Sequence, residues 1–167
     1  MPATETDLFR RLADLGIETT TVRHPPVYTV EESKALRGDL ASGHIKNLFL
    51  KDKKGALWLV VAMEDRAIDL KALRHAIGAG PLSFAKSDLL LEVLGIEPGA
   101  VTPLSLINDI EGRVVPVLDA ALMDCDVINC HPLTNAATTA IAPQDLVRFI
   151  RACGHEPRVM DFQGISR

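Results

Sequence analysis

One short stretch, Gly43 to Leu50, constrains the fold more than any other because it has the pattern of a buried strand that opens with polar residues. Its last three residues, Leu48–Leu50, form a continuous apolar run, which is typical of a strand covered on both faces. Lys46 and Asn47 precede that run, and a lysine is almost never fully buried without a partner. The pair therefore indicates the wall of a groove or pocket. The alternative is that the Lys46 stem lies over apolar surface while Asn47 caps a turn.

The remaining pattern mixes helices and strands without strict alternation, which predicts an α/β or α+β fold with a mixed sheet. Capping residues and apolar periodicity predict helices that begin near Thr4, Thr29, Asp69, Ser87 and Pro143. Strands are predicted at Ile17–Val22, Ile45–Leu50, Leu57–Ala62, Val114–Leu118, Val127–Cys130, Ala137–Ile141 and Arg158–Phe162. The length of 167 residues suits one domain, so we expect a single domain over residues 1–167.

The charge of the chain is unevenly distributed. The net charge is −4, but residues 34–86 carry ten Lys and Arg against five acids, which leaves −9 on the rest. A basic middle in an acidic protein is compatible with an anionic ligand on one face. For the hairpin at Lys51–Gly55, a solvated lysine-rich turn is the better explanation.

Three features of the sequence bear on the cellular compartment in which the protein acts. No apolar run approaches the roughly 18 residues of a membrane span, and the first residues lack the layout of a signal peptide. The three cysteines, Cys125, Cys130 and Cys153, make an odd count without CxxC spacing, which favours a reducing cytosol. We therefore expect a cytoplasmic protein.

Standard catalytic motifs are missing from the sequence. The five histidines do not show the helical spacing of zinc enzymes, and there is no GxSxG elbow or phosphate-binding loop. We expect no metal and no cofactor. A nucleophilic pair formed by Cys130 and a histidine remains an alternative to a buried structural cysteine.

Two further segments are candidates for a site. Gly95–Pro103 contains two glycines and two prolines, which predicts an exposed loop with a constrained backbone. The Gly99 amide can approach a ligand closely because glycine has no Cβ, although a tight connection explains the spacing equally well. His131, at the end of a predicted strand, lines a pocket mouth or is a satisfied core histidine.

Taken together, these segments resemble the YbaK/prolyl-tRNA-synthetase-associated family of free-standing aminoacyl-tRNA editing domains. The resemblance spans nearly the whole chain. The segments that carry it are Gly43–Leu50, the G-x-x-x-P loop Gly99–Pro103, Leu106-Ile107-Asn108-Asp109 and His131–Thr139. It implies the fold of that family, a single domain with a mixed, mostly antiparallel curved sheet flanked by helices. Lys46 followed by Asn47 is similar to the branch that removes alanine from mischarged tRNA(Pro).

The resemblance also implies a chemistry and roles for particular residues. The reaction is hydrolysis of the ester between a wrong amino acid and the terminal ribose, without metal or protein nucleophile, and with a free ribose hydroxyl assisting water. Lys46 would contact the terminal nucleotide or the ester, and Asn47 would hold the aminoacyl end. The Gly99 and Ala100 amides would face the reacting carbonyl or the ribose. The residues expected to bind the substrate are Val30, Thr102, Pro103 and His131.

The implied partner is the aminoacylated end of tRNA(Pro), with transient contact to prolyl-tRNA synthetase or an elongation factor. We expect a monomer that binds neither DNA nor membrane. Size exclusion of proline fits the physics, because an extra methylene contact contributes only about 1–3 kcal/mol of selectivity. The alternatives are a Cys-tRNA(Pro) deacylase, a non-catalytic module that binds tRNA or a synthetase, and a regulatory domain for a small amino acid or nucleotide.

Overall fold

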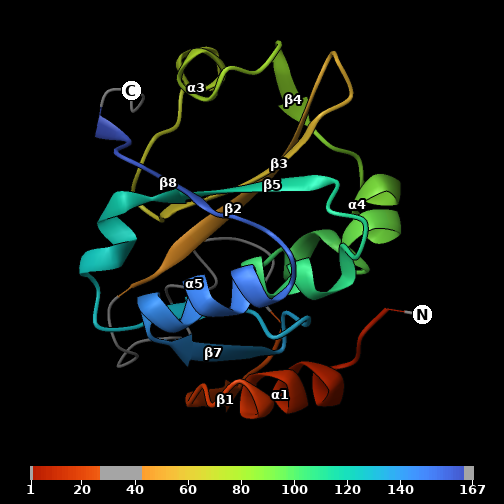
Figure 1. The fold of residues 1–167 in the computed structure, drawn as a ribbon, viewed down its shortest axis with the longest axis vertical. Coiled ribbons are helices and arrows are strands. Elements are labelled where there is room, and N and C mark those ends of the chain that lie inside the picture. The colour runs from red at the N-terminus through yellow and green to blue at the C-terminus, as the bar shows by residue number, and fades with distance from the viewer. Residues whose placement is uncertain (1, 27–42, 164–167) are drawn as a thin grey trace.

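The computed structural model describes residues 2–26 and 43–163 and places their strands in two sheets (Figure 1). The predicted helix from Thr29 to Leu36 lies outside the described residues. The three-stranded sheet has the order β1 (Thr19–Arg23), β7 (Ala137–Ile141), β6 (Ile128–Cys130). The five-stranded sheet has the order β4 (Leu82–Phe84), β2 (Ile45–Asp52), β3 (Leu57–Met63), β5 (Val114–Asp119), β8 (Arg158–Met160).

The predicted α+β class is confirmed, and four of the six strand pairings among the described residues are antiparallel. The predicted hairpin forms, with Ile45 opposite Met63 and Lys51 opposite Leu57. Strand β3 is buried along nearly its whole length, as expected for a central strand with both faces covered. The single sheet that we expected is instead divided in two, and an isolated bridge between His44 and Asn129 joins them.

The five-stranded sheet separates two apolar cores. One face packs against the three-stranded sheet and side chains of α1 (Glu5–Asp14), α4 (Ser87–Leu94) and α5 (Pro143–Ala152). The other face packs against Leu73 and Ile77 of α3 (Leu70–Ile77). Figure 1 shows α3 at the top of the molecule, with α1 and β1 at the bottom.

Most of the predicted helix ends are confirmed. Thr4 and Asp7 form a capping box at the start of α1, and the Asp69 side chain caps α3. The prediction that Ser87 caps a helix is wrong, because Lys86 is the N-cap of α4 and makes no side-chain capping bond. The sequence also predicted no strand at β4, and β8 ends at Met160 rather than at Phe162.

Gly43 brings the segment before β2 into close contact with the segment before β6. Its φ is +92°, and a Cβ built at this position would lie 1.8 Å from the backbone oxygen of Val127. Its own carbonyl oxygen accepts a hydrogen bond of 3.0 Å from the Asn129 amide. Only glycine allows both the conformation and the contact, so this residue fixes where β2 begins relative to β6.

Replacing Gly43 by alanine should therefore destabilise the fold more than the same change at Gly55. Gly55 has a similar φ of +89° but open space around it. Both variants should lose about 1–3 kcal/mol to backbone strain, and Gly43→Ala should lose about 2 kcal/mol more to the steric clash. Chemical denaturation of the two variants measures the difference, and equal losses would show that the contact with Val127 is not a constraint.

Candidate functional site

A cleft of about 470 Å³ brings together two of the segments that the sequence identified. One wall is the chain from Gly95 to Ala100, and the other is the loop Leu133–Asn135. The volume lies within the range of small-molecule sites in proteins. The cleft is therefore a candidate for the pocket that we expected at Gly99.

The first wall is a tight turn at the end of α4. Gly95 ends that helix in the left-handed region, and Pro98–Ala100 then form the 3₁₀ helix η1. The Ala100 amide donates a hydrogen bond of 2.9 Å to the Glu97 carbonyl oxygen, so this amide is engaged within the turn. Gly99 lines the cleft, and the role expected for its amide stays a prediction.

The continuation of this segment is buried rather than exposed as predicted. Thr102 and Pro103 are both buried, and neither is among the residues that line the cleft. The Thr102 hydroxyl accepts a hydrogen bond of 3.2 Å from the Leu104 amide at the start of the 3₁₀ helix η2 (Pro103–Asn108). These two residues therefore lie on the buried side of the turn and do not face the cleft.

The second wall follows directly from the end of β6. Leu133 has a φ of +70°, and it is the only non-glycine residue with a positive φ in the part of the chain that the structure describes. Its half-buried side chain packs against the main apolar core. A leucine in this region costs roughly 1–2 kcal/mol, so the surrounding structure holds it there.

His131 lies two residues earlier, is half-buried, and is not among the residues that line the cleft. Its Nδ1–H donates to the Ala137 carbonyl oxygen at 3.0 Å, which leaves Nε2 as an acceptor in the neutral ring. Burial lowers the pKa of His131, and electrostatic repulsion from nearby His24 lowers it further. The hydrogen bond to Ala137 raises it in part. At neutral pH the ring is therefore an uncharged hydrogen-bonding group.

Lys46 and Asn47 point to opposite faces of the five-stranded sheet, because successive side chains on a strand alternate. Lys46 pairs with Ala62, whose side chain belongs to the core beneath α3, and Asn47 pairs with Val61 in the other core. Neither residue is among those that line the cleft. The structure therefore does not bring the lysine and the asparagine together as one pair.

Each of the two side chains has a distinct environment. The half-buried Lys46 donates through Nζ to the Arg66 carbonyl oxygen. The Arg66 guanidinium contacts the fully buried Asp119 carboxylate at 2.6 Å. The Asn47 Oδ1 is buried and has no hydrogen-bond partner among the described residues, a condition that is uncommon in native structures.

The cysteines lack the character of nucleophiles. Burial raises the pKa of the Cys130 thiol to about 12 and that of the Cys153 thiol to about 11. Burial also raises the pKa of Cys125, with contributions from Asp124, Asp126 and Asp119. Because the thiolate is the reactive form, these thiols stay protonated and unreactive at neutral pH.

Sequence reasoning missed Leu133 and the pair Arg66–Asp119. No local sequence pattern identifies a leucine with a left-handed backbone. An ion pair between residues 53 positions apart can be recognised only once the fold is known. Val30, the remaining expected site residue, lies outside the described residues. Within residues 2–26 and 43–163, no group of three or more His, Cys, Asp or Glu is arranged to hold a metal ion. No helix in these ranges has the length and apolar character to cross a membrane.

Comparison with known proteins places this geometry in context. The family model described as "Aminoacyl-tRNA editing domain" matches residues 24–149. The chain is 42% identical over 161 residues to prolyl-tRNA synthetase associated domain-containing protein 1 of Mus musculus, covering 93% of this chain and 95% of that protein. It is 39% identical over 146 residues to the prolyl-tRNA editing protein ProX of Acetoanaerobium sticklandii, covering 87% and 89%.

A solved structure has the same fold. The "putative trans-editing enzyme for prolyl tRNA synthetase" superimposes with a TM-score of 0.73 over 96% of this chain and 98% of that one. The sequences are 20% identical, so this match supports the fold alone.

The pKa values of the cysteines predict an order of chemical modification. Treatment of the folded protein with iodoacetamide at pH 8 should modify Cys125 first and Cys130 last, because Cys130 is buried and its pKa is raised to about 12. Mass spectrometry of tryptic peptides over time measures the order, with urea-unfolded protein as the control. Rapid modification of Cys130 in the folded protein would restore the alternative of a Cys/His nucleophile.

Proposed function

The chain belongs to the aminoacyl-tRNA editing domain family, and on that premise we propose that it hydrolyses mischarged Ala-tRNA(Pro) in trans. The bond that breaks is the ester between alanine and the terminal ribose of the tRNA. The relatives support a role in correcting the errors of prolyl-tRNA synthetase, and the Lys46-Asn47 pair favours alanine as the amino acid removed. The proposed site of action is the cytoplasm, where the protein would meet its tRNA.

The observation that carries this proposal is the cleft between the Gly99 turn and Leu133. A volume of about 470 Å³ exceeds that of an alanyl group and leaves room for part of the terminal nucleoside. Leu133 is held in a left-handed conformation that glycine would adopt more easily. Since strain of this kind clusters at functional sites, we assign the Leu133 side chain as a wall that limits the size of the amino acid.

The chemistry requires positioning rather than a protein nucleophile. Water attacks the ester carbonyl carbon, the bond to the ribose oxygen breaks, and that oxygen leaves with a proton. The Gly99 amide is the proposed donor to the oxyanion, because donors fixed where charge develops contribute most to such reactions. The Ala100 amide, which we expected to share this role, is bonded to Glu97 and is no longer assigned to it.

The substrate itself supplies the remaining help. As the family resemblance implies, a free hydroxyl of the terminal ribose assists the attacking water. Neutral His131 offers Nε2 as an acceptor to a substrate hydroxyl or ammonium group. This arrangement needs no thiolate, in agreement with the raised pKa of the buried Cys130 thiol.

Lys46 and Asn47 bind different parts of the substrate in this proposal. The Lys46 ammonium binds a phosphate of the terminal nucleotide in exchange for the Arg66 carbonyl oxygen. The buried Asn47 Oδ1, which has no partner among the described residues, accepts a hydrogen bond from the aminoacyl end. Because the two side chains point to opposite faces of the sheet, Lys46 binds the phosphate and Asn47 binds the amino acid at separate places.

The deciding experiment follows the loss of amino acid from Ala-, Cys- and Pro-tRNA(Pro). Ala-tRNA(Pro) should be hydrolysed fastest and Pro-tRNA(Pro) spared, since a rigid wall can reject a larger side chain outright. Faster loss of cysteine would indicate a Cys-tRNA(Pro) deacylase instead. Binding of tRNA without hydrolysis of any substrate would indicate a non-catalytic module.

A variant in the wall tests the size limit directly. Leu133→Ala should raise hydrolysis of Pro-tRNA(Pro) relative to Ala-tRNA(Pro), because it removes the proposed barrier to proline. Leu91→Ala is a matched control, since Leu91 lies on the exposed side of α4. An unchanged proline-to-alanine ratio in Leu133→Ala would remove Leu133 from the site.

Lys46 should matter for catalysis more than for stability. A charge-assisted hydrogen bond to a phosphate contributes roughly 1.5–3 kcal/mol, so Lys46→Ala should lower kcat/KM about ten- to a hundred-fold. Lys46→Arg should also lower it, because the planar guanidinium does not replace a compact ammonium. Both variants should keep nearly the wild-type Tm, with Arg10→Ala on α1 as a control. Wild-type turnover by Lys46→Ala would contradict the assignment.

A further inference from the structure

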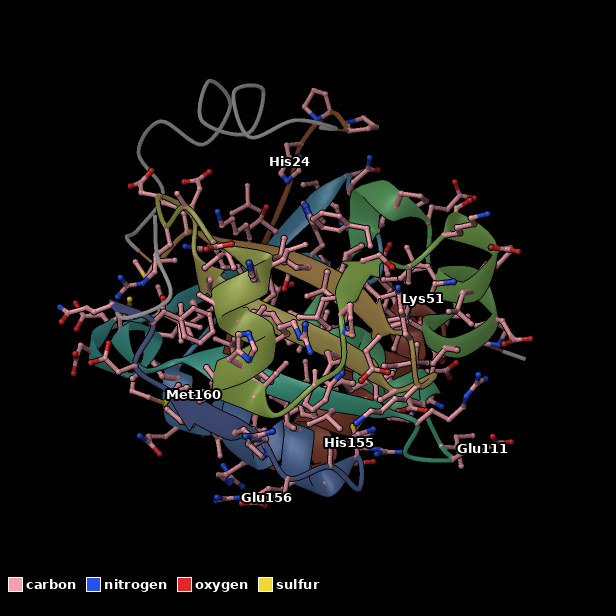
Figure 2. All side chains as sticks on the ribbon, turned by 90° about the horizontal axis from the view of Figure 1, so that it is seen from above. His24, Lys51, Glu111, His155, Glu156 and Met160 are labelled. Carbon is pink, nitrogen blue, oxygen red and sulfur yellow. The ribbon has the colours of Figure 1, made fainter. Side chains whose placement is uncertain are left out.

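Exposed lysines precede and follow an exposed phenylalanine along the edge of the five-stranded sheet, where β4 pairs with the β2–β3 hairpin. Figure 1 shows β4 and this hairpin at the same end of the molecule as α3. Figure 2 looks down on this end and labels Lys51, which pairs with Ser83 of β4 and therefore points to the opposite face of the sheet from Phe84. We call this surface the basic edge; it consists of Lys53, Lys54, Phe84 and Lys86. Phe84 is 61% exposed, an unusual position for a large aromatic side chain.

The position of Phe84 follows from the sheet. Strand β4 is the outermost strand of the five-stranded sheet, and it pairs on one side only, with β2. Phe84 lies opposite Leu50, and Ser83 lies opposite Lys51. The backbone remains extended at Lys86, with φ −75° and ψ 162°, so Phe84 and Lys86 project on the same side of the chain.

The hairpin that carries the other lysines is held firmly against β4. The Asp52 carboxylate accepts hydrogen bonds from the amides of Lys54 and Ala56 within the hairpin, at 2.9 Å each. Its second oxygen accepts one of 3.1 Å from the Gly80 amide, just before β4. The backbone of the turn that carries the lysines is therefore held in place, so binding has to order only their side chains.

The charge of the basic edge is largely uncompensated. Lys53, Lys54 and Lys86 are exposed, and no salt bridge within the described residues engages any of these three lysines. The buried Asp52 offsets part of this charge, and Asp88 is the exposed carboxylate nearest in sequence to Lys86. Lysines around an exposed aromatic ring are the combination that binds single-stranded nucleic acid, where phosphates meet the cations and bases stack on the ring.

The basic edge is also close enough to the cleft to bind the same molecule. Lys86 is the N-cap of α4, and Gly95, at the other end of that helix, lines the cleft. A helix of eight residues is roughly 12 Å long at about 1.5 Å per residue. A few nucleotides of unpaired RNA span that distance.

We propose that the basic edge binds the unpaired 3′ end of the tRNA, next to the nucleotide whose aminoacyl group enters the cleft. An unpaired base stacks on Phe84, and neighbouring phosphates lie against Lys86 and the hairpin lysines. This inference rests on the proposed function, because it takes the cleft as the aminoacyl site. It adds a second point of contact that fixes the direction in which the strand approaches.

The test is binding of deacylated tRNA, which requires no hydrolysis. Lys86→Glu should raise the Kd about ten-fold and lower the slope of log affinity against log salt by about 1. The fold should survive, because a carboxylate at the N-terminus of α4 is favoured by the helix dipole. Arg10→Glu makes the same charge change at the opposite end of the molecule, on α1, and should leave the Kd nearly unchanged.

Phe84→Ala separates stacking from charge. With an RNA minihelix that carries the unpaired 3′ end, this variant should raise the Kd about ten-fold. With a blunt minihelix that lacks the unpaired end, Phe84→Ala and the wild type should bind equally. Wild-type affinity of both Lys86→Glu and Phe84→Ala for tRNA would overturn the proposal, as would an equal loss in Arg10→Glu.

Hydrolysis of a small substrate distinguishes failure of this proposal from failure of the function. On 3′-O-alanyl adenosine, Lys86→Glu and Phe84→Ala should match the wild type, while on Ala-tRNA(Pro) both should show a raised KM. A wild-type protein that hydrolyses neither substrate refutes the proposed function, yet the binding comparison still decides the role of the basic edge. Equal KM values on Ala-tRNA(Pro) for the variants and the wild type would count against the basic edge alone.

Discussion

The close contact between Gly43 and Val127 is the constraint on which the rest of this structure depends. At this point the segments before β2 and β6 lie so close together that a Cβ on Gly43 would not fit between them. The bridge between His44 and Asn129 begins at the next residue. Strand β2 starts from that junction and forms the hairpin whose continuation is the buried central strand β3. Strand β6 leaves the same junction towards Leu133. The strand with Lys46 and the loop with Leu133 are thus fixed relative to each other by backbone contacts.

The opposite wall of the cleft depends on a second set of hydrogen bonds. The Asn108 side chain donates to the Leu94 carbonyl oxygen at the end of α4 and accepts from the Ala3 amide. The Thr102 carbonyl oxygen accepts from the Ser105 hydroxyl at 2.6 Å in a fully buried position. These bonds hold the Gly95–Ala100 turn from behind. A cleft between two segments that are each anchored to the core keeps its shape, as discrimination by size requires.

The sequence was sufficient for the elements whose signals are local. The central hairpin, the capping box at Thr4 and the C-terminal helix α5 follow from apolar periodicity and capping residues. Strand β4 was missed because three residues after a proline carry too little pattern to identify a strand. Lys86, rather than Ser87, is the N-cap of α4 because the extended backbone ends at Lys86 and the helix begins at Ser87. Helix boundaries are defined only to within one or two residues. Because side chains alternate along a strand, the sequence alone implies that Lys46 and Asn47 point to opposite faces of the sheet. The family resemblance, in which the two residues form one motif, led us to place them together.

The central claim is that the cleft between Gly99 and Leu133 binds the aminoacyl end of the substrate. An amide-linked alanyl adenosine, which cannot be hydrolysed, allows this to be measured by NMR titration of the labelled protein. The account predicts that the largest shifts in backbone amide signals occur at Gly99 and at Leu133–Asn135, with smaller shifts at Asn47. Shifts confined to Lys46, Arg66 and the face beneath α3, with the cleft residues unchanged, would contradict it.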